Sequence, residues 1–350
     1  MIVLTIIVFI LVFGLIVFVH ELGHFLMAKQ YGVEVEEFAF GLPPRLIGRK
    51  KGNTLYAINL IPLGGYVRLR GENEDDVSPG SFSQKSAKSR AIILAAGVLM
   101  NLILAWLILS FLLVIPPQWK ASDAVLVAQV QSGSSAEQAH VHTGDVLLKM
   151  DDLVVTSPSV LHEFTISHQG QEVTMTYRQN GIEHQKKLTL AQGDAPLGVG
   201  VVSFSLAAVP NPVWWKAPWV ALSELWNILS ANVVFLGGLI AGLLGSAKNV
   251  STESVSGPVG IYGLLAQFTA LGWVYVLAAV AQLSLAIAVF NILPIPALDG
   301  GRILFVFINK IFGKKIISSQ IEAISHTIGF GLLMLLFVIV TFRDIVRLIR

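Results

Sequence analysis

The sequence contains no cysteine and few charged residues. The absence of cysteine excludes a disulfide framework, a thiolate zinc site and a cysteine nucleophile. Only 13% of the 350 residues are charged while 54% are apolar, and the mean hydropathy is +0.71. A water-exposed chain of this length would carry more charge, so the composition predicts an integral membrane protein.

An excess of charge of either sign is also absent. Lys and Arg number 24 and Asp and Glu number 22, which gives a formal net charge of +2. No broad basic field is available to hold phosphates, so nucleic acid is excluded as a partner. The eight histidines and the acidic residues remain as possible metal ligands.

Four long apolar segments predict a polytopic α-helical membrane protein, because a helix needs ~20 apolar residues to cross the hydrocarbon core. The predicted spans are residues 1–27, residues 91–115, residues 273–293 of the segment 273–310, and residues 328–342 of the segment 326–350. Residues 219–244 are a weaker candidate, because Gly237, Gly238 and Gly242 interrupt them and tryptophans precede them. We therefore expect interfacial helices within residues 206–272.

The distribution of lysine and arginine predicts the orientation of these spans. Residues 28–90 carry ten such residues, whereas the longer segment 116–272 carries seven. The shorter segment is therefore expected in the cytosol, with both termini and the middle region on the extracytoplasmic side. Arg343, Arg347 and Arg350 at the C-terminus count against this orientation but are outnumbered.

Residues 120–205 predict a compact extracytoplasmic α+β domain. The segment 125–131 is typical of a strand, and the segment 143–151 of a tight turn followed by a buried strand. Two alternating runs within residues 172–190 flank Asn180-Gly181, a dipeptide typical of a β-hairpin turn.

The sequence His20-Glu21-Leu22-Gly23-His24 interrupts the first apolar helix. Residues four apart share a helical face, so both histidines can bind one Zn²⁺ while Glu21 lies beside the open coordination position as a general base. Two surface histidines would be the simpler explanation in a soluble protein. Within a spanning helix each ionisable residue costs on the order of 2.5 to 3.5 kcal/mol, so these groups need an internal partner and metal binding is favoured.

A catalytic zinc site usually takes three protein ligands and leaves one position for water. Asp299 is the best candidate for the third ligand, because it follows Pro294 and Pro296 and precedes Gly300 and Gly301. Prolines end a helix and glycines permit a sharp turn, so the carboxylate can reach the first span. The alternative is that Asp299 only caps the next helix.

Together these motifs resemble the site-2 protease family of intramembrane zinc metalloproteases, and within it the bacterial regulator-of-sigma-E protease branch. The resemblance spans nearly the whole chain. It rests on the motif at residues 20–24, the Asn-x-x-Pro-x-Pro-x-Leu-Asp-Gly sequence from Asn291 to Gly300, and the segments 61–67 and 256–261.

The resemblance implies a multi-pass protein of the bacterial inner membrane with one zinc ion per chain. His20, His24 and Asp299 would bind the ion, Glu21 would be the catalytic base, and residues 120–205 would form a PDZ-like domain. Three features depart from the family pattern. The sequences Ala96-Gly97-Val98 and Phe40-Gly41-Leu42 lack a usual proline, and one PDZ-like module occurs where the sigma-E branch often has two.

A membrane-associated β-hairpin is expected at about residues 54–70. A protease in the bilayer must unwind its substrate helix, and an edge strand can replace the lost hydrogen bonds. The resemblance favours this role over an ordinary hairpin, so Gly64, Gly65 and Tyr66 are candidate substrate-binding residues. For the side chain of Asn291 two roles are open, a hydrogen bond to the substrate backbone and a hydrogen bond between helices.

The predicted function is intramembrane proteolysis of single-pass membrane proteins within the lipid bilayer, with anti-sigma factors and remnant signal peptides as candidate substrates. The alternative is a catalytically inactive, PDZ-bearing scaffold of the same fold, although the base and all three ligands are retained. A channel or carrier would normally show paired hydrophobic repeats, which are absent from this sequence. The remaining histidines lack ligand spacing in a membrane helix and are expected at the surface or at caps, namely His140, His142, His162, His168, His184 and His326.

Overall fold

The computed structural model describes residues 2–72, 76, 78–115, 125–131, 133–142, 145–179, 182–193, 195–203, 213–243, 257–313 and 316–349. The chain forms two compact units, of which one comprises Met1–Leu109, Ala221–Gly263 and Ala278–Arg350 and the other Ser110–Val220 and Leu264–Leu277. The predicted turn at Asn180-Gly181 lies outside the described residues.

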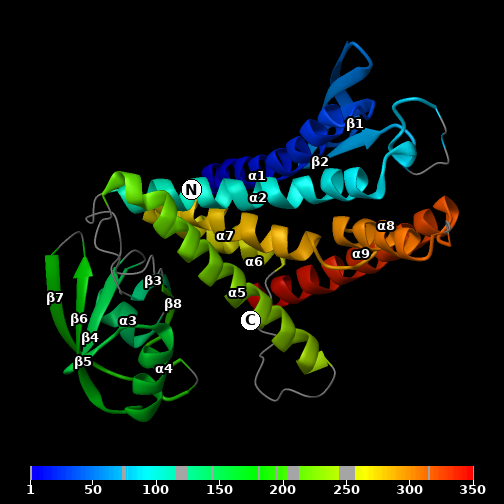
Figure 1. Cartoon of the computed structure of the whole chain (residues 1–350). Helices are drawn as coiled ribbons and strands as arrows, with labels where there is room; N and C mark the ends of the chain where they lie inside the picture. Colours follow the sequence, from blue (N-terminus) through cyan, green and yellow to red (C-terminus); the bar gives the residue numbers. More distant parts are fainter. Residues whose placement is uncertain are drawn as a thin grey trace. The chain divides into compact units, whose positions relative to one another are not determined.

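Five helices among the described residues are long and apolar enough to cross a membrane. They are α1 (Ile2–Gln30), α2 (Ala87–Val114), α5 (Ala217–Leu243), α7 (Trp273–Asn291) and α9 (Ser319–Ile349), as labelled in Figure 1. In α1, apolar side chains surround the whole helix before His20, as expected for a helix in lipid. The protein is therefore a polytopic helical membrane protein, with five candidate spans instead of the expected four.

The helix α5 is continuous through Gly237 and Gly238, so the prediction that glycines break this segment is wrong. A glycine inside a helix costs only about 1 kcal/mol relative to alanine, which flanking leucines and alanines can offset. A short 3₁₀ turn, Trp214–Lys216, precedes the helix and carries exposed tryptophans.

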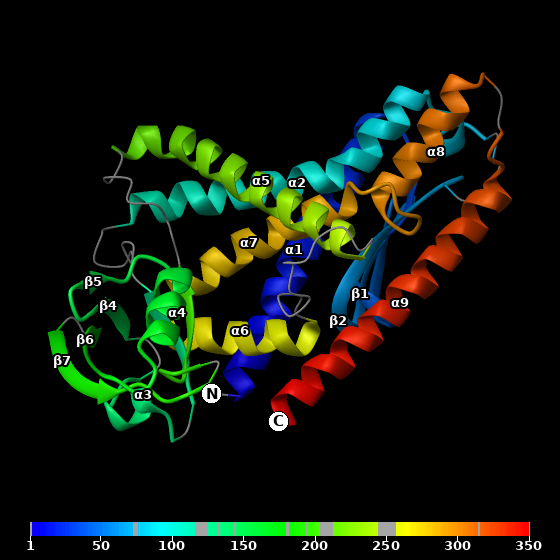
Figure 2. The same ribbon diagram turned by 90° about the horizontal axis from the view of Figure 1, so that it is seen from below.

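A two-stranded sheet of β1 (Val35–Lys51) and β2 (Thr54–Leu69) lies against α1 (Figures 1 and 2). The expected hairpin within residues 54–70 differs from the structure, because these residues form the single strand β2, whose partner is β1 across a turn at Gly52-Asn53. Ala39 pairs with Tyr66 on one side and with Ala57 on the other. The first half of β1 therefore lies between the two halves of β2. Residues 65–69 form an edge that pairs with no other strand of the described residues.

The second unit contains an α+β domain, as predicted. Its sheet has the order β7-β6-β4-β3-β8, with β5 paired to β4. The strands are β3 (Val125–Val130), β4 (Val146–Met150), β5 (Leu153–Val154), β6 (Glu172–Gln179), β7 (Ile182–Thr189) and β8 (Val199–Ser203). The helices α3 (Ser135–Gln138) and α4 (Pro158–Ser167) complete the domain. Every second residue of two strands enters its core, namely Val125 and Val127 on β3 and Val173, Met175 and Tyr177 on β6.

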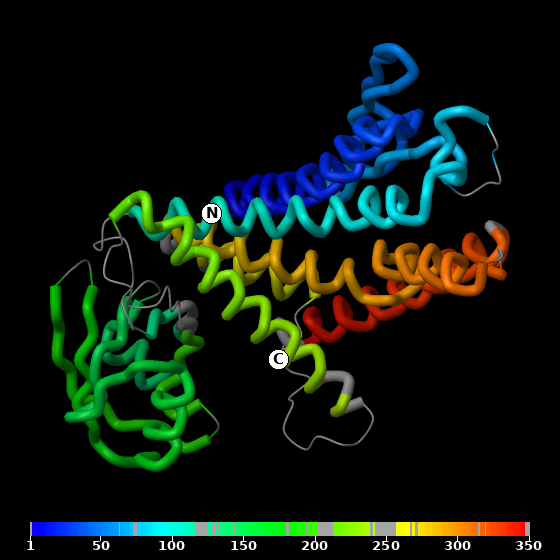
Figure 3. Tube along the Cα trace, in the orientation of Figure 1, coloured from blue at the N-terminus to red at the C-terminus, as the bar shows by residue number. Residues whose placement is uncertain are grey.

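A non-helical connection separates α7 from α8 (Asp299–Ile311), and α8 continues in the same general direction as α7, as the tube in Figure 3 traces. Pro294 and Pro296 lie in this connection, and Ala297 adopts a left-handed conformation with φ of 85°. A further helix, α6 (Pro258–Leu271), precedes α7 and is tied to α9, because Asp344 accepts a hydrogen bond from the backbone of Gly260 at 2.8 Å.

Candidate metal centre

Three side chains from α1 and α8 meet at one point. The Nε2 atoms of His20 and His24 lie 3.2 Å apart, and Asp299 Oδ2 lies 3.1 Å from the first and 3.4 Å from the second. A tetrahedral ion with zinc–ligand bonds near 2.0–2.1 Å holds its ligand atoms ~3.3 Å apart. The three residues therefore fit a zinc ion closely, and among the described residues they form the one group with metal-binding geometry.

Both histidines are held by groups on α2. His24 Nδ1 donates to the carbonyl oxygen of Ile93 at 2.9 Å, which leaves Nε2 free of a proton for a metal. His20 Nδ1 lies 3.4 Å from the amide of Asn101, whose Oδ1 is buried without a hydrogen-bond partner. With the amide turned so that Oδ1 faces the ring, Oδ1 accepts the Nδ1 proton of His20 and both groups are satisfied.

Asn101 is itself fixed to a third helix. Its backbone carbonyl accepts a hydrogen bond from Ser284 Oγ on α7 at 2.9 Å, and both residues are fully buried. Neither Asn101 nor Ser284 was predicted as a functional residue from the sequence. A polar residue inside each of two apolar helices is the signal that could have found them.

Glycines let the helices and histidines approach each other. A Cβ atom on Gly97 would lie 2.5 Å from His24 Nε2 and 2.8 Å from His20 Nε2, so the two imidazoles occupy the space that any side chain at this position of α2 would take. Gly23 similarly brings α1 against the backbone of Ala96. The departure from the family pattern, Val98 in place of the usual proline, therefore directly follows the glycine at the metal centre.

The carboxylate of Asp299 is aimed at the histidines and caps no helix. The cap position of α8 is Leu298, and no side chain makes a capping hydrogen bond there. Gly300 and Gly301 pack against the backbone carbonyls of residues 292–295, which closes the turn tightly. These contacts explain why two glycines follow the acid.

His326 on α9 holds the same turn, contrary to the expectation of a surface or cap residue. Its Nδ1 accepts a hydrogen bond from the backbone of Ala297 at 2.7 Å, and its side chain is only 14% exposed. Gly329, one turn later, packs against the carbonyl of Pro296. An ion pair between Arg302 and Glu72 adds a link from α8 to the segment after β2.

Glu21 lies between the metal centre and the hairpin edge. Its Cγ would be 3.4 Å from a Cβ atom on Gly65, and its carboxylate lies within hydrogen-bonding reach of the Val67 backbone. The free edge of β2 therefore runs directly beside the candidate base.

The other candidate substrate-binding residues are placed differently. Tyr66 points to the opposite face of the sheet from Gly65, and its hydroxyl donates to the buried carboxylate of Glu37 at 3.0 Å. Gly64 has a φ of 97° and packs on Leu42. Asn291 is the last residue of α7 and is half-buried.

The profile of Peptidase family M50 matches residues 8–336. The chain belongs to peptidase family M50. A protein named as a zinc metalloprotease in Clostridium acetobutylicum is 31% identical over 343 residues, which cover 98% of this chain and 97% of that relative. The zinc metalloprotease RasP of Oceanobacillus iheyensis is 28% identical over 435 positions, with 98% and 99% covered. The regulator of sigma-W protease RasP of Bacillus subtilis is 27% identical over 438 positions, with the same coverage.

These findings confirm the predicted family, enzyme class and cofactor. The chain is a zinc-dependent intramembrane metalloprotease of the site-2 type. Among solved structures, the PDZ domain of the SdrC-like protein from Listeria monocytogenes matches 24% of this chain and 92% of its own, with 20% identity and a TM-score of 0.22.

Proposed function

We propose that this M50 peptidase cleaves the transmembrane segments of single-pass membrane proteins, with His20, His24 and Asp299 binding its zinc ion and Glu21 acting as the base. The observation that carries the assignment is the set of three distances, 3.1, 3.2 and 3.4 Å, among the candidate ligand atoms. Bound zinc would polarise the scissile carbonyl and activate a water molecule.

Glu21 is the group that can move the protons of the reaction. It directly follows His20 on the helix, so its carboxylate projects beside the ligand face and not into it. In this place it can accept a proton from the attacking water and then donate it to the leaving amine. Hydrolysis breaks one peptide bond and consumes one water, so a single carboxylate suffices for both transfers.

The free edge of β2 can bind the substrate backbone. A transmembrane helix hides its carbonyls in internal hydrogen bonds, and these must be replaced once the helix is unwound in lipid. Residues 65–69 offer unpaired backbone groups beside Glu21, so an added substrate strand would bring its own carbonyls toward the metal centre. Gly65 lets α1 pack closely against this strand, because a Cβ atom there would contact Glu21 and Val17.

Four spans fit the helix directions better than five. The C-terminal parts of α1 and α7 both lead to the metal centre, whereas α2 leaves it, so an even number of crossings must separate α2 from α7. If α5 crossed the membrane, α6 would have to cross back, but its 14 residues extend only ~21 Å. We therefore place residues 28–86 in the cytosol, with both termini and the α+β domain outside.

The substrate class follows from this arrangement and from the relatives. The Bacillus subtilis relative is named as a regulator of sigma-W protease, so an anti-sigma factor with one membrane span is the first candidate substrate. Remnant signal peptides are the second candidate, because they too are single apolar helices. The α+β domain is proposed to be PDZ-like.

The test of the proposed function is co-expression with single-pass candidate substrates. Glu21→Gln should retain zinc but abolish cleavage, because the amide keeps the shape of the side chain and cannot accept a proton. Asp299→Ala should lose zinc and cleavage together, because an anionic ligand is removed. Continued cleavage by Glu21→Gln, or full zinc content in Asp299→Ala, would reject these assignments.

A further inference from the structure

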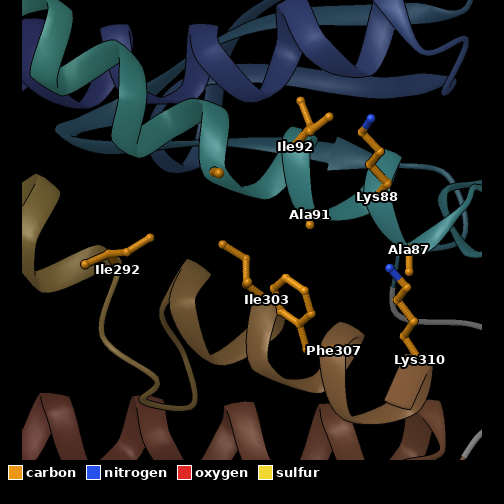
Figure 4. Close-up of a pocket in the computed structure, with 9 residues that line it drawn as sticks. Ala87, Lys88, Ala91, Ile92, Ile292, Ile303, Phe307 and Lys310 are labelled. Atoms are coloured by element: carbon orange, nitrogen blue, oxygen red, sulfur yellow. The ribbon is translucent and has the colours of Figure 1, made fainter. Parts of the chain in front are cut away.

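An apolar groove of about 430 Å³ lies between α2 and α8, outside the metal centre (Figure 4). Its α2 wall is formed by Ala87, Ala91 and Ala95, which are four residues apart and therefore share one face. The opposite wall carries Ile303 and Phe307. Small side chains on one helix and large ones on the other leave a groove of the size that holds a small amphiphile.

One end of this groove is basic. Lys88 and Lys310 line it from the first turn of α2 and the last turn of α8, and both side chains are exposed. Neither ammonium group has an ion-pair partner within the part of the chain that the structure describes. In Figure 4 the ammonium group of Lys310 lies beside Ala87, whereas the side chain of Lys88 extends from the side of α2 that faces away from α8, on a flexible stem that can turn toward the groove.

The other end of the groove points toward the metal centre. Ile303 lies one helical turn after Asp299, and Ala95 lies close in sequence to Gly97 on α2. The groove is thus an apolar passage with its charged mouth at one end only. A ligand that fits this groove has an anionic head and an unbranched apolar tail.

We propose that this groove binds an anionic phospholipid, with its phosphate at Lys310, the side chain of Lys88 turned toward it, and one acyl chain along the alanines of α2. Basic pockets between transmembrane helices on the cytoplasmic side are suited to such headgroups. The proposed orientation places this mouth on the cytosolic side.

An unwound substrate segment fits the groove less well. Its backbone would need new hydrogen-bond partners in lipid, and both walls are helices whose own backbone groups are already bonded. An acyl chain needs no such partners. The substrate backbone finds them instead along the edge of β2, so the two ligands occupy different places.

The test is to count phosphatidylglycerol that stays bound to the full-length protein. The protein is reconstituted in vesicles of phosphatidylcholine and phosphatidylglycerol, extracted in mild detergent, and examined by native mass spectrometry. The wild type should retain about one phosphatidylglycerol per chain in preference to phosphatidylcholine. Each lysine near a membrane surface contributes roughly five-fold in affinity for an anionic lipid, so Lys88→Gln with Lys310→Gln should weaken retention roughly 25-fold.

Two further variants separate the headgroup from the tail. Lys50→Gln with Lys51→Gln removes the same charge at the exposed end of β1 and should leave retention unchanged. Ala91→Phe fills the groove and should release the lipid without changing either lysine. Zinc content is measured in every variant and should equal that of the wild type, because none of these residues contacts a candidate ligand.

The proposal is overturned if the groove variants retain as much phosphatidylglycerol as the β1 variant, or if the wild type retains phosphatidylcholine equally well. Release of the lipid by an inactive-enzyme complex with a single-pass substrate would also overturn it, because the groove would then hold the peptide. These outcomes do not depend on cleavage, so they are distinct from failure of the proposed catalytic residues.

Discussion

The positions of the candidate ligand atoms depend on residues that carry no catalytic group. Gly97 keeps α2 from filling the space beside both imidazoles, and Asn101 and Ile93 hold their outer nitrogens. Such outer contacts fix the tautomer of each ring and therefore which nitrogen faces the metal. At the scale of single residues, the positions of the two imidazoles therefore depend on α2 as well as on α1.

Local spacing explains which of these residues the sequence predicts. His20, Glu21 and His24 lie within one helical turn of each other, so their geometry follows from the helix alone. Asp299 was predicted from the prolines and glycines around it. Asn101, Ser284 and His326 act through contacts between helices far apart in the chain, and no pattern in one helix shows which neighbour it will meet.

Replacement of Asn101 tests the outer contacts. Asn101→Ala should weaken zinc binding about 10- to 100-fold, because His20 loses the partner that fixes its ring. Zinc retention against a chelator is the measurement, and Asn232→Ala is the matched control, since that asparagine lies on α5 away from the ligands. Equal zinc retention in the two variants would show that Asn101 has no part in orienting His20.

The elements around the metal centre are coupled through short, specific contacts. The α7–α8 turn is fastened to α9 by His326 and Gly329, and α9 is fastened to α6 by Asp344. Most other side chains of α9 are exposed, as expected for a helix that faces lipid. A hairpin was expected within residues 54–70, but these residues form β2 alone, and the pairing of β1 with both halves of β2 was not predicted, since strand pairing depends on the whole sheet.

The free edge of β2 supplies the prediction at this scale. The backbone N–H of Val67 donates to the carboxylate of Glu21, on the side of the strand that pairs with no other described strand, and an added substrate strand would take over this donor. Val67→Pro removes that donor and should reduce cleavage of a membrane-embedded substrate about ten-fold, which corresponds to one hydrogen bond of about 1.4 kcal/mol. Cleavage in reconstituted vesicles is the measurement, with zinc content as a check on folding.

Val67→Ala is the control for this change, because it shortens the side chain and keeps the N–H. Its cleavage rate should stay near that of the wild type. If alanine and proline reduce cleavage equally, the side chain of Val67 matters and strand addition along this edge is wrong.

At the scale of the whole molecule, the sequence predicted a membrane-embedded unit and an α+β domain because their compositions differ. The domain alternates apolar and polar residues, whereas the helices are continuously apolar. The strand β8 and the helix α4 were not anticipated, because each is a short segment whose burial depends on the rest of the domain. The extra long helix α5 was misjudged because glycine content is a weak guide to helix continuity in an apolar segment.

The α+β domain is proposed to act as a size filter that admits substrates already trimmed outside the membrane. It contributes none of the candidate ligands, so the metal centre should survive its removal. A folded module of about 85 residues has a radius of gyration of ~12 Å, which is large enough to obstruct the approach of a second folded domain. Replacing residues 120–205 with a short Gly/Ser linker should therefore make an untrimmed substrate cleavable, while a trimmed substrate is cut about as before.

A domain that instead recruits substrates through an exposed strand edge would change cleavage in the opposite direction, because its removal would slow cleavage of both substrates. Cleavage of paired trimmed and untrimmed substrates by the inserted, zinc-containing variant separates the two roles, and an untrimmed substrate that stays uncut excludes the filter.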